Sequence, residues 1–112
     1  ESVAMCRTLH PAVRVISKQT LRQFWEGSSG RSEARRALEA WHREARRATW
    51  RSPQEIKQRY ATASVLKGGR VVFNICGNRY RLVVRINFGQ QIAYVRFVGT
   101  HAEYDAIDAE TV

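Results

Sequence analysis

The stretch VVFNICGNRYRLVVRINFGQQIAYVRFVGT, residues 71–100, decides the fold of this chain. Apolar and polar residues alternate along it, which indicates half-buried β-strands. Gly77-Asn78 and Gly89-Gln90 interrupt the alternation where two-residue hairpin turns are expected. The stretch therefore predicts three antiparallel strands joined by two tight turns.

Two-residue turns fix the register of the strands, so the cross-strand pairs follow directly. The first turn pairs Asn74 with Arg81 and Arg70 with Arg85. The second turn predicts the pairs Arg85–Tyr94, Val84–Val95, Val83–Arg96, Leu82–Phe97 and Arg81–Val98, with Thr100 opposite Arg79.

On this register one face of the sheet is apolar and the other is basic. The apolar face, which must pack on helices, collects Val71, Phe73, Ile75, Tyr80, Leu82, Val84, Ile86, Ala93, Val95 and Phe97. The opposite face, called the basic face below, collects Arg70, Asn74, Arg79, Arg81, Arg85, Tyr94 and Arg96, with Val72, Val83 and Val98 between them. We expect the basic face to be open for binding. The alternative is that a partner protein covers it, or the acidic segment with Glu103, Asp105, Asp108 and Glu110.

The sequence before residue 70 predicts a short strand and three helices. Residues 13–16 are β-branched and alternate, and a helix is expected after Ser17. A longer helix is expected over 33–49, and a third from Ser52, where Ser52, Pro53 and Glu55 form a capping-box pattern, to about Tyr60. A small strand within 61–66, a turn at 68–69 and one helical turn from about residue 100 complete the expected elements.

These patterns predict one domain over residues 13–112, preceded by a poorly ordered extension over residues 1–12. The fold class is α+β: an N-terminal strand, with two to three helices packed on one face of a mainly antiparallel sheet.

The charge of the chain points to a polyanionic partner. Its formal net charge is +9, and no acidic residue falls between Glu55 and Glu103. The chain has two cysteines, and its histidines do not have the spacing of a zinc site, so a reducing cytoplasm and no metal or cofactor are expected. No apolar run is long enough to span a bilayer, so no membrane partner is expected.

His101 and Tyr104 follow the third strand of the hairpin region, at the end of the sheet that carries Arg79 and Arg81. A base, an acid and a cation around one phosphate suffice for RNA cleavage without a metal, through attack of the ribose 2′-OH on phosphorus. On the residues alone, RNA binding is favoured over cleavage. A DNA-binding repressor ranks last, because no helix-turn-helix pattern accompanies the helical stripe of Arg36, Arg43 and Arg47. That stripe is otherwise expected to be a solvated face or to touch flanking or ribosomal RNA.

The strings FNICGNRYRL (73–82) and FVGTHAEYD (97–105) resemble the C-terminal half of HigB-type toxins of bacterial toxin–antitoxin systems, within the RelE-like superfamily. The order of VRVISKQTLRQFWE (13–26) and SPQEIKQRYATAS (52–64) fits the same family, so the resemblance covers about residues 13–108. It implies a RelE-like fold and a metal-free mRNA endonuclease that usually acts on the ribosome and inhibits translation. It also implies a HigA-type antitoxin with a helix-turn-helix domain, through which the complex binds operator DNA.

The resemblance also implies roles for individual residues. Arg81 matches the arginine at the cleaved phosphate, and His101 and Tyr104 fall in the segment that carries basic and aromatic catalytic residues. Asn74 stands where RelE has a lysine, so Arg79 or Arg70 is expected to supply the cation. The candidates for phosphate and RNA binding are Arg70, Asn74, Arg79, Arg85, Tyr94 and Arg96.

Overall fold

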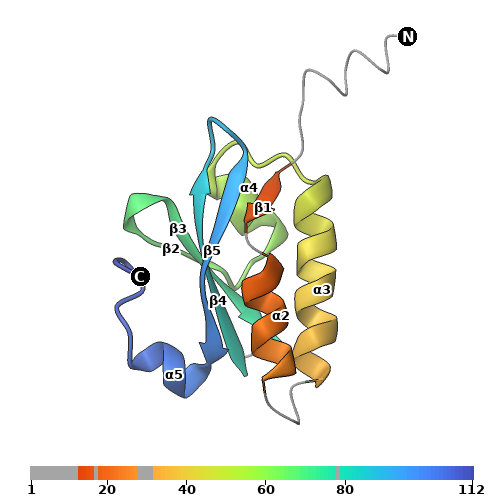
Figure 1. Cartoon of the computed structure of the whole chain (residues 1–112). Coiled ribbons are helices and arrows are strands. Elements are labelled where there is room, and N and C mark those ends of the chain that lie inside the picture. The colour runs from red at the N-terminus through yellow and green to blue at the C-terminus, as the bar shows by residue number, and fades with distance from the viewer. Residues whose placement is uncertain (1–12, 17, 28–31, 78) are drawn as a thin grey trace, which may run out of the picture.

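A five-stranded sheet forms the centre of the protein, which is described here by a computed structural model of residues 13–16, 18–27, 32–77 and 79–112 (Figure 1). In spatial order the strands are β1 (Arg14–Ile16), β5 (Ile92–Thr100), β4 (Tyr80–Asn87), β3 (Arg70–Ile75) and β2 (Ser64–Val65). β1 runs parallel to β5, and the other neighbours are antiparallel. The predicted α+β fold class is confirmed.

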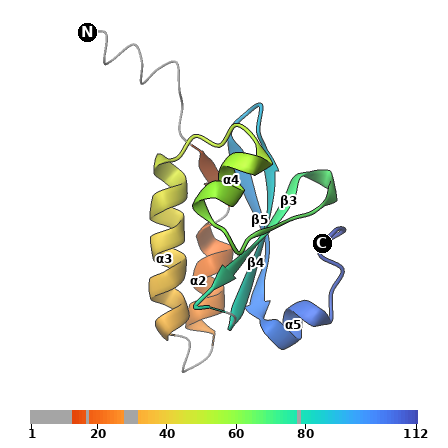
Figure 2. The same cartoon turned by 180° about the vertical axis from the view of Figure 1, so that it is seen from behind.

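Three helices cover one face of the sheet, and the C-terminal part of the chain lies on the other (Figures 1 and 2). The covering helices are α2 (Lys18–Glu26), α3 (Ser32–Arg47) and α4 (Pro53–Arg59). A 3₁₀ turn, η1 (Lys67–Gly69), precedes β3, and a short helix, α5 (His101–Asp105), follows β5. The long helix ends two residues before the predicted Thr49. The expected extension 1–12, the expected cap Ser17 and the turn residue Asn78 lie outside the described residues.

The main core lies between the helices and the sheet, and aromatic rings fill its centre. The ring of Phe73 lies 5.3 Å from Trp41, 5.0 Å from Tyr60 and 6.1 Å from Trp50, measured between ring centroids. Phe73 is 1% exposed. Edge and stacked contacts of this kind add to the free energy gained by burying the rings. The core therefore fixes how the helices sit on β3.

The start of α4 differs in one detail from the predicted capping box. Ser52 Oγ accepts the hydrogen bond of the Glu55 amide at 3.4 Å, as predicted. The Glu55 carboxylate, however, accepts from the amide of Arg51 at 3.0 Å rather than from that of Ser52. The helix end is still capped, because both side chains satisfy amides that have no partner within the helix.

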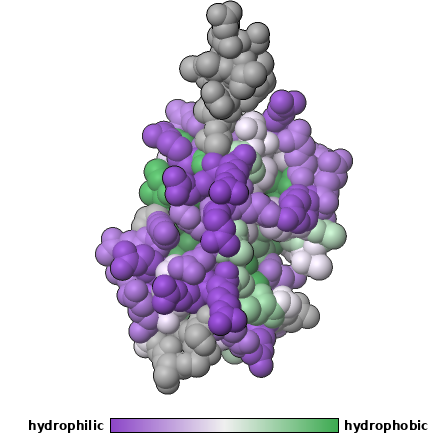
Figure 3. Space-filling view, turned by 90° about the vertical axis from the view of Figure 1, so that its right-hand side faces the viewer, coloured by the Kyte–Doolittle hydropathy of each residue, from purple (hydrophilic) through white to green (hydrophobic). Residues whose placement is uncertain are grey.

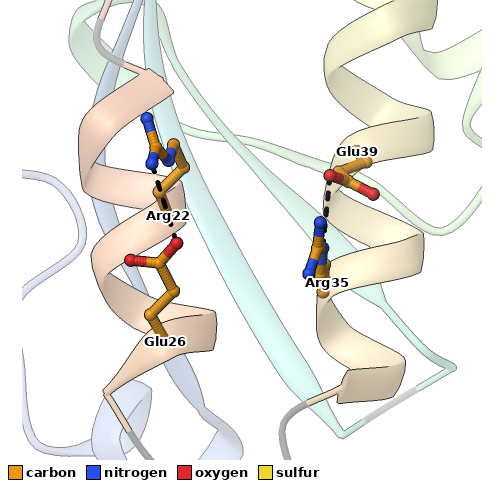
Figure 4. Close-up of polar contacts among 4 residues, drawn as sticks. All are labelled: Arg22, Glu26, Arg35 and Glu39. Carbon is orange, nitrogen blue, oxygen red and sulfur yellow. Dashed lines mark hydrogen bonds and ion pairs between the residues drawn. The ribbon is translucent and has the colours of Figure 1, made fainter.

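The outer face of α2 and α3 is largely hydrophilic (Figure 3). Exposed ion pairs lie along both helices, Arg22–Glu26 at 3.8 Å and Arg35–Glu39 at 3.3 Å (Figure 4). Each is an i,i+4 pair open to solvent, so each contributes only about 0.3–0.5 kcal/mol to stability. No helix in the described part of the chain combines the length and the apolar character needed to cross a membrane.

A β-bulge in β5 corrects the predicted register of the second hairpin. Pairing follows the prediction as far as Val84–Val95, but the next pair is Val83–Phe97, which leaves Arg96 as the extra residue. Leu82 therefore faces Val98, Arg81 faces Gly99 and Tyr80 faces Thr100. The predicted pairs Val83–Arg96, Leu82–Phe97, Arg81–Val98 and Arg79–Thr100 are wrong. The register of the first hairpin, from Arg70–Arg85 to Asn74–Arg81, is confirmed.

The bulge exchanges the faces of two side chains, because a slip of one residue turns every later side chain over. Val98 packs against the main core, although it was predicted on the basic face. Phe97, predicted in the main core, instead lies in a second, smaller cluster on the opposite side of the sheet. That cluster consists of Val72, Val83 and Ala109, with Leu66, Phe97, Tyr104 and Val112 packed against them.

The loop between β4 and β5 is longer than the predicted two residues, since pairing ends at Asn87–Ile92. Gln91 is 8% exposed and has a positive φ of 56°. Its side chain accepts a hydrogen bond from the Trp50 amide at 2.9 Å and donates to the Phe88 carbonyl at 2.7 Å. Gln91 therefore ties this loop to the connection between α3 and α4, which accounts for a buried polar side chain here.

His42 makes the stability of the fold depend on pH. The side chain lies on α3 and is 7% exposed, and its pKa is lowered by burial and then by the nearby charges of Lys18 and Arg46. The unfolded chain therefore takes up a proton near the ordinary value of about 6.5, before the folded chain does. We expect the free energy of unfolding, measured in urea, to be lower at pH 5.5 than at pH 7.5. The drop should be smaller in His42→Leu, and an equal drop in both proteins would contradict the assignment.

Candidate functional site

Arg81 and Tyr104 meet at one end of the basic face. The guanidinium carbon of Arg81 lies 5.9 Å from the centroid of the Tyr104 ring, in a cation–π arrangement. Arg81 stands on β4 opposite Gly99 of β5, and Tyr104 comes from α5, which begins directly after that strand. Two of the three predicted catalytic residues are therefore in contact.

A complete capping box fixes α5 against the end of the sheet. The Thr100 hydroxyl accepts from the Glu103 amide at 3.2 Å, and the Glu103 carboxylate accepts from the Thr100 amide at 2.8 Å. The His101 amide donates to the Arg79 carbonyl at 3.1 Å, so His101 rather than Thr100 lies beside Arg79. Because the helix is this short, these bonds at its first turn are what hold His101 and Tyr104 in place.

His101 is paired with a carboxylate. Its Nδ1 lies 3.0 Å from Oδ2 of Asp105, four residues later on α5. A hydrogen bond from Nδ1–H to a carboxylate fixes the tautomer of the imidazole and presents Nε2 to a reactant. The histidine side chain is 52% exposed, so solvent and ligands can reach it. The spacing His101-x-x-x-Asp105 is visible in the sequence, but our sequence analysis did not include Asp105 among the site residues.

Gly99 lies close to Phe97 and Glu103 at the base of this site. A Cβ added at Gly99 would lie 2.6 Å from the Phe97 ring and 2.9 Å from the Glu103 carboxylate. Gly99→Ala should therefore lower the free energy of unfolding by about 1–3 kcal/mol, because it forces packed atoms apart. Gly89→Ala is the matched control, since its nearest atom lies at 3.5 Å. Equal stability of the two variants in urea titrations would contradict this packing.

Arg79 and Asn74, predicted at the phosphate, have partners elsewhere. Arg79 forms an ion pair with Glu33, in the first turn of α3. The side-chain amide of Asn74 donates to the Thr62 carbonyl at 3.1 Å, across the open part of the β3 edge. Contacts between residues this far apart in the sequence have no signature in local spacing, so the sequence could not reveal them.

The other predicted binding residues gather at the far end of the basic face. Arg70 faces Arg85 across β3 and β4, and Arg85 faces Tyr94 across β4 and β5. Arg85 and Tyr94, together with Arg96 and Phe88, line a pocket of about 630 Å³. Arg81 and Arg85 are four residues apart on one strand, which corresponds to roughly 13 Å. The basic face therefore has two separate groups of side chains, one at each end.

The C-terminal segment covers part of the basic face, which was the alternative to an open surface. Residues 106–112 turn back from α5 across the sheet, on the side away from α2 and α3 (Figures 1 and 2). Ala109 is 9% exposed and lies in the small cluster with Val72 and Val83. The backbone oxygen of Val112 accepts hydrogen bonds from Arg70 and Arg96. The expectation of a fully open face is therefore wrong, and Asp108 and Glu110 lie on the covering segment.

No group of three or more His, Cys, Asp or Glu side chains suited to a metal ion occurs within the described ranges. What the site offers chemically is a cation on an aromatic ring, an oriented imidazole and a phenol, next to a surface rich in arginine. Such a set can bind a phosphodiester, move protons and stabilise negative charge on phosphorus.

Residues 34–107 match a family model described as HigB_toxin, RelE-like toxic component of a toxin-antitoxin system. No curated protein is significantly similar to the chain. The matched range includes α3 from residue 34 onward, the whole of β2 to β5 and α5, and therefore both groups of side chains on the basic face.

Proposed function

The chain belongs to the HigB toxin family of RelE-like toxic components of toxin–antitoxin systems, and from this premise we propose that it is an endoribonuclease that cleaves messenger RNA in the cytoplasm and so inhibits translation. The observation that carries the proposal is the contact of Arg81 with Tyr104, on the same short helix that carries the imidazole of His101. A cation, an imidazole and a phenol at the rim of a basic sheet face match what cleavage by the ribose 2′-OH requires.

The reaction needs two proton transfers and one stabilised charge. The 2′-oxygen attacks the adjacent phosphorus, forming a new O–P bond while the bond from phosphorus to the 5′-oxygen breaks. His101 and Tyr104 together take the proton of the 2′-OH and protonate the leaving 5′-oxygen, and Arg81 stabilises the charge on the phosphorane. The products are a 2′,3′-cyclic phosphate and a 5′-hydroxyl. No metal or cofactor takes part in this scheme.

Asp105 acts as a positioning residue in this scheme. Its carboxylate lies at Nδ1 of His101, so Nε2 is the nitrogen that faces the substrate.

The RNA runs along the basic face in this proposal. From the scissile phosphate at Arg81, the strand continues toward the pocket lined by Arg85, Tyr94 and Arg96, where an aromatic ring among cations suits a stacked base. Arg79 and Asn74 belong to the edge of this path rather than to its centre, given their contacts with Glu33 and Thr62.

A second basic surface supports action on the ribosome. Arg36, Arg43 and Arg47 are exposed on α3, on the opposite side of the molecule from the basic face, and the outer helical face is hydrophilic (Figure 3). The two surfaces face in different directions, so they can contact different RNA molecules. We infer that messenger RNA binds the basic face while ribosomal RNA contacts α3.

A toxin–antitoxin family implies an antitoxin partner. We propose that this partner is a HigA-type protein with a helix-turn-helix domain, and that the toxin reaches operator DNA only through it.

Induced expression followed by mapping of RNA 5′ ends tests the proposed function. Wild-type protein should arrest growth and create new 5′ ends within messages, and Arg22→Ala, which removes an exposed arginine of α2, should do the same. An RNA-binding module without catalysis is the alternative. It would bind single-stranded RNA in vitro and leave the pattern of 5′ ends unchanged, and that result would overturn the nuclease assignment.

A further inference from the structure

The segment that crosses the basic face is seated on it by apolar contacts. Ala109 is 9% exposed and packs in the cluster with Val72 and Val83, which Val112 also joins. The amides of Thr111 and Val112 both donate to the Asp108 carbonyl, at 3.1 and 3.0 Å, and form a tight final turn. Residues 106–112, called the strap below, therefore have a defined position on the sheet.

Two guanidinium groups converge on the end of the strap. The backbone oxygen of Val112 accepts from Nη2 of Arg70 at 2.9 Å, from Nε of Arg70 at 3.1 Å and from Nε of Arg96 at 3.4 Å. No Asp or Glu side chain of the described residues forms an ion pair with Arg70 or Arg96. Guanidinium groups that converge on one oxygen can hold a phosphate oxygen in the same place, because arginine binds phosphate through charge-assisted hydrogen bonds.

This pair of arginines, called the clamp below, adjoins the pocket at the far end of the basic face. Arg96 lines the pocket and is the extra residue of the β-bulge. A bulge changes the direction of the side chain of its extra residue. Arg70 is the cross-strand neighbour of Arg85, which also lines the pocket. A phosphate in the clamp would therefore place its nucleotide beside Tyr94 and Phe88.

We propose that the clamp of Arg70 and Arg96 is a phosphate subsite for single-stranded RNA, and that the strap occupies it in the free protein. The inference rests on the proposed function, because it assumes that RNA binds the basic face. A phosphodiester oxygen takes the place of the Val112 oxygen, and the strap leaves the sheet when it does. Asp108 and Glu110 are exposed on the strap, so its departure also removes two negative charges from the path of the RNA.

Substitution in the strap tests the proposal in the full chain. Ala109→Gln puts a larger polar side chain among apolar residues and so unseats the strap without changing the charge. Ala106→Gln is the matched control, because Ala106 is exposed in the same segment. Binding is measured by fluorescence anisotropy on a 2′-deoxy oligonucleotide, which has the phosphates of RNA but cannot be cleaved through a 2′-OH.

Ala109→Gln should bind this oligonucleotide about tenfold more tightly than wild type. This factor corresponds to the free energy of one charge-assisted hydrogen bond. The slope of log K against log salt should steepen by about 0.7, the value for one further phosphate contact on a single strand. Adding Arg70→Ala and Arg96→Ala should remove both gains. Equal binding by the Ala109 and Ala106 variants, or a gain that survives loss of the clamp, would overturn the proposal.

Hydrogen exchange on the wild-type chain gives a second reading if Ala109→Gln fails to fold. Amides of residues 109–112 should exchange faster when the oligonucleotide is bound, because the strap is displaced. Unchanged or slower exchange would overturn the proposal. If the clamp proposal is wrong, cleavage of ribonucleotide substrates is still expected. If the nuclease assignment is wrong, the predicted changes in binding of the 2′-deoxy oligonucleotide are still expected.

Discussion

His101→Ala should lower the rate of RNA cleavage by about 10²–10⁴-fold, the usual contribution of a general acid or base. The imidazole belongs to the first residue of α5, directly after β5, and its Nδ1 lies 3.0 Å from Oδ2 of Asp105. Removing the ring removes a proton-transfer group but takes no cation from the basic face. The variant should therefore keep the wild-type affinity for a 2′-deoxy oligonucleotide while it loses cleavage.

Asp105→Asn tests whether Asp105 positions the His101 imidazole for catalysis or only stabilises α5. The imidazole remains, but an amide that can donate as well as accept replaces the carboxylate at Nδ1, so one tautomer is no longer fixed. We expect a smaller loss of cleavage than in His101→Ala, seen in kcat rather than in KM, and no change in thermal unfolding. A variant that unfolds more easily but cleaves normally per folded molecule would contradict the positioning role.

Arg81→Ala should lower cleavage by about 10²–10³-fold, the cost of removing one group that stabilises developing negative charge. Unlike His101→Ala, it should also weaken binding of the 2′-deoxy oligonucleotide and reduce the salt slope by about 0.7, because one phosphate contact is lost. The guanidinium lies over Tyr104, so the substitution also leaves the phenol less well held.

Arg22→Ala is the matched control for Arg81→Ala. Both remove one positive charge, but Arg22 lies on α2 and pairs only weakly with Glu26 across 3.8 Å (Figure 4). The control should cleave RNA at the wild-type rate. If both arginine variants lose cleavage equally, then net charge rather than a phosphate site at Arg81 accounts for the effect.

The sequence predicts the sheet up to the point where its pattern becomes ambiguous. In the first hairpin, one register places Arg70, Asn74, Arg81 and Arg85 on the same face, and that register is confirmed. In β5, Phe97 and Val98 are adjacent apolar residues, so hydrophobicity alone cannot tell which one faces the core. The bulge at Arg96 determines which of the two residues faces the core. No glycine or proline stands at the bulge to indicate it in the sequence.

The candidate site was predictable where neighbours in sequence form it. His101 and Tyr104 follow β5 by one and four residues, and the end of that strand brings Tyr104 to Arg81 and the His101 amide to the Arg79 carbonyl. From the sequence, coverage of the basic face by the strap could be stated only as an alternative to an open face. The residues that hold the strap on the sheet, Ala109 and Val112, are small or terminal in the acidic segment and show no periodic pattern. The ion pair of Arg79 could not be predicted from the sequence, since its partner Glu33 lies in another layer of the fold.

The most direct test of the account is the chemistry of the RNA ends produced by the wild-type protein and by a double variant, Arg81→Ala with His101→Ala. Messenger RNA is cleaved on ribosomes, and the new ends are assayed for 5′-hydroxyl and 2′,3′-cyclic phosphate groups. The account predicts both groups at the wild-type cleavage sites and no such ends with the double variant. Ends that carry a 5′-phosphate, or identical ends from the two proteins, would contradict it.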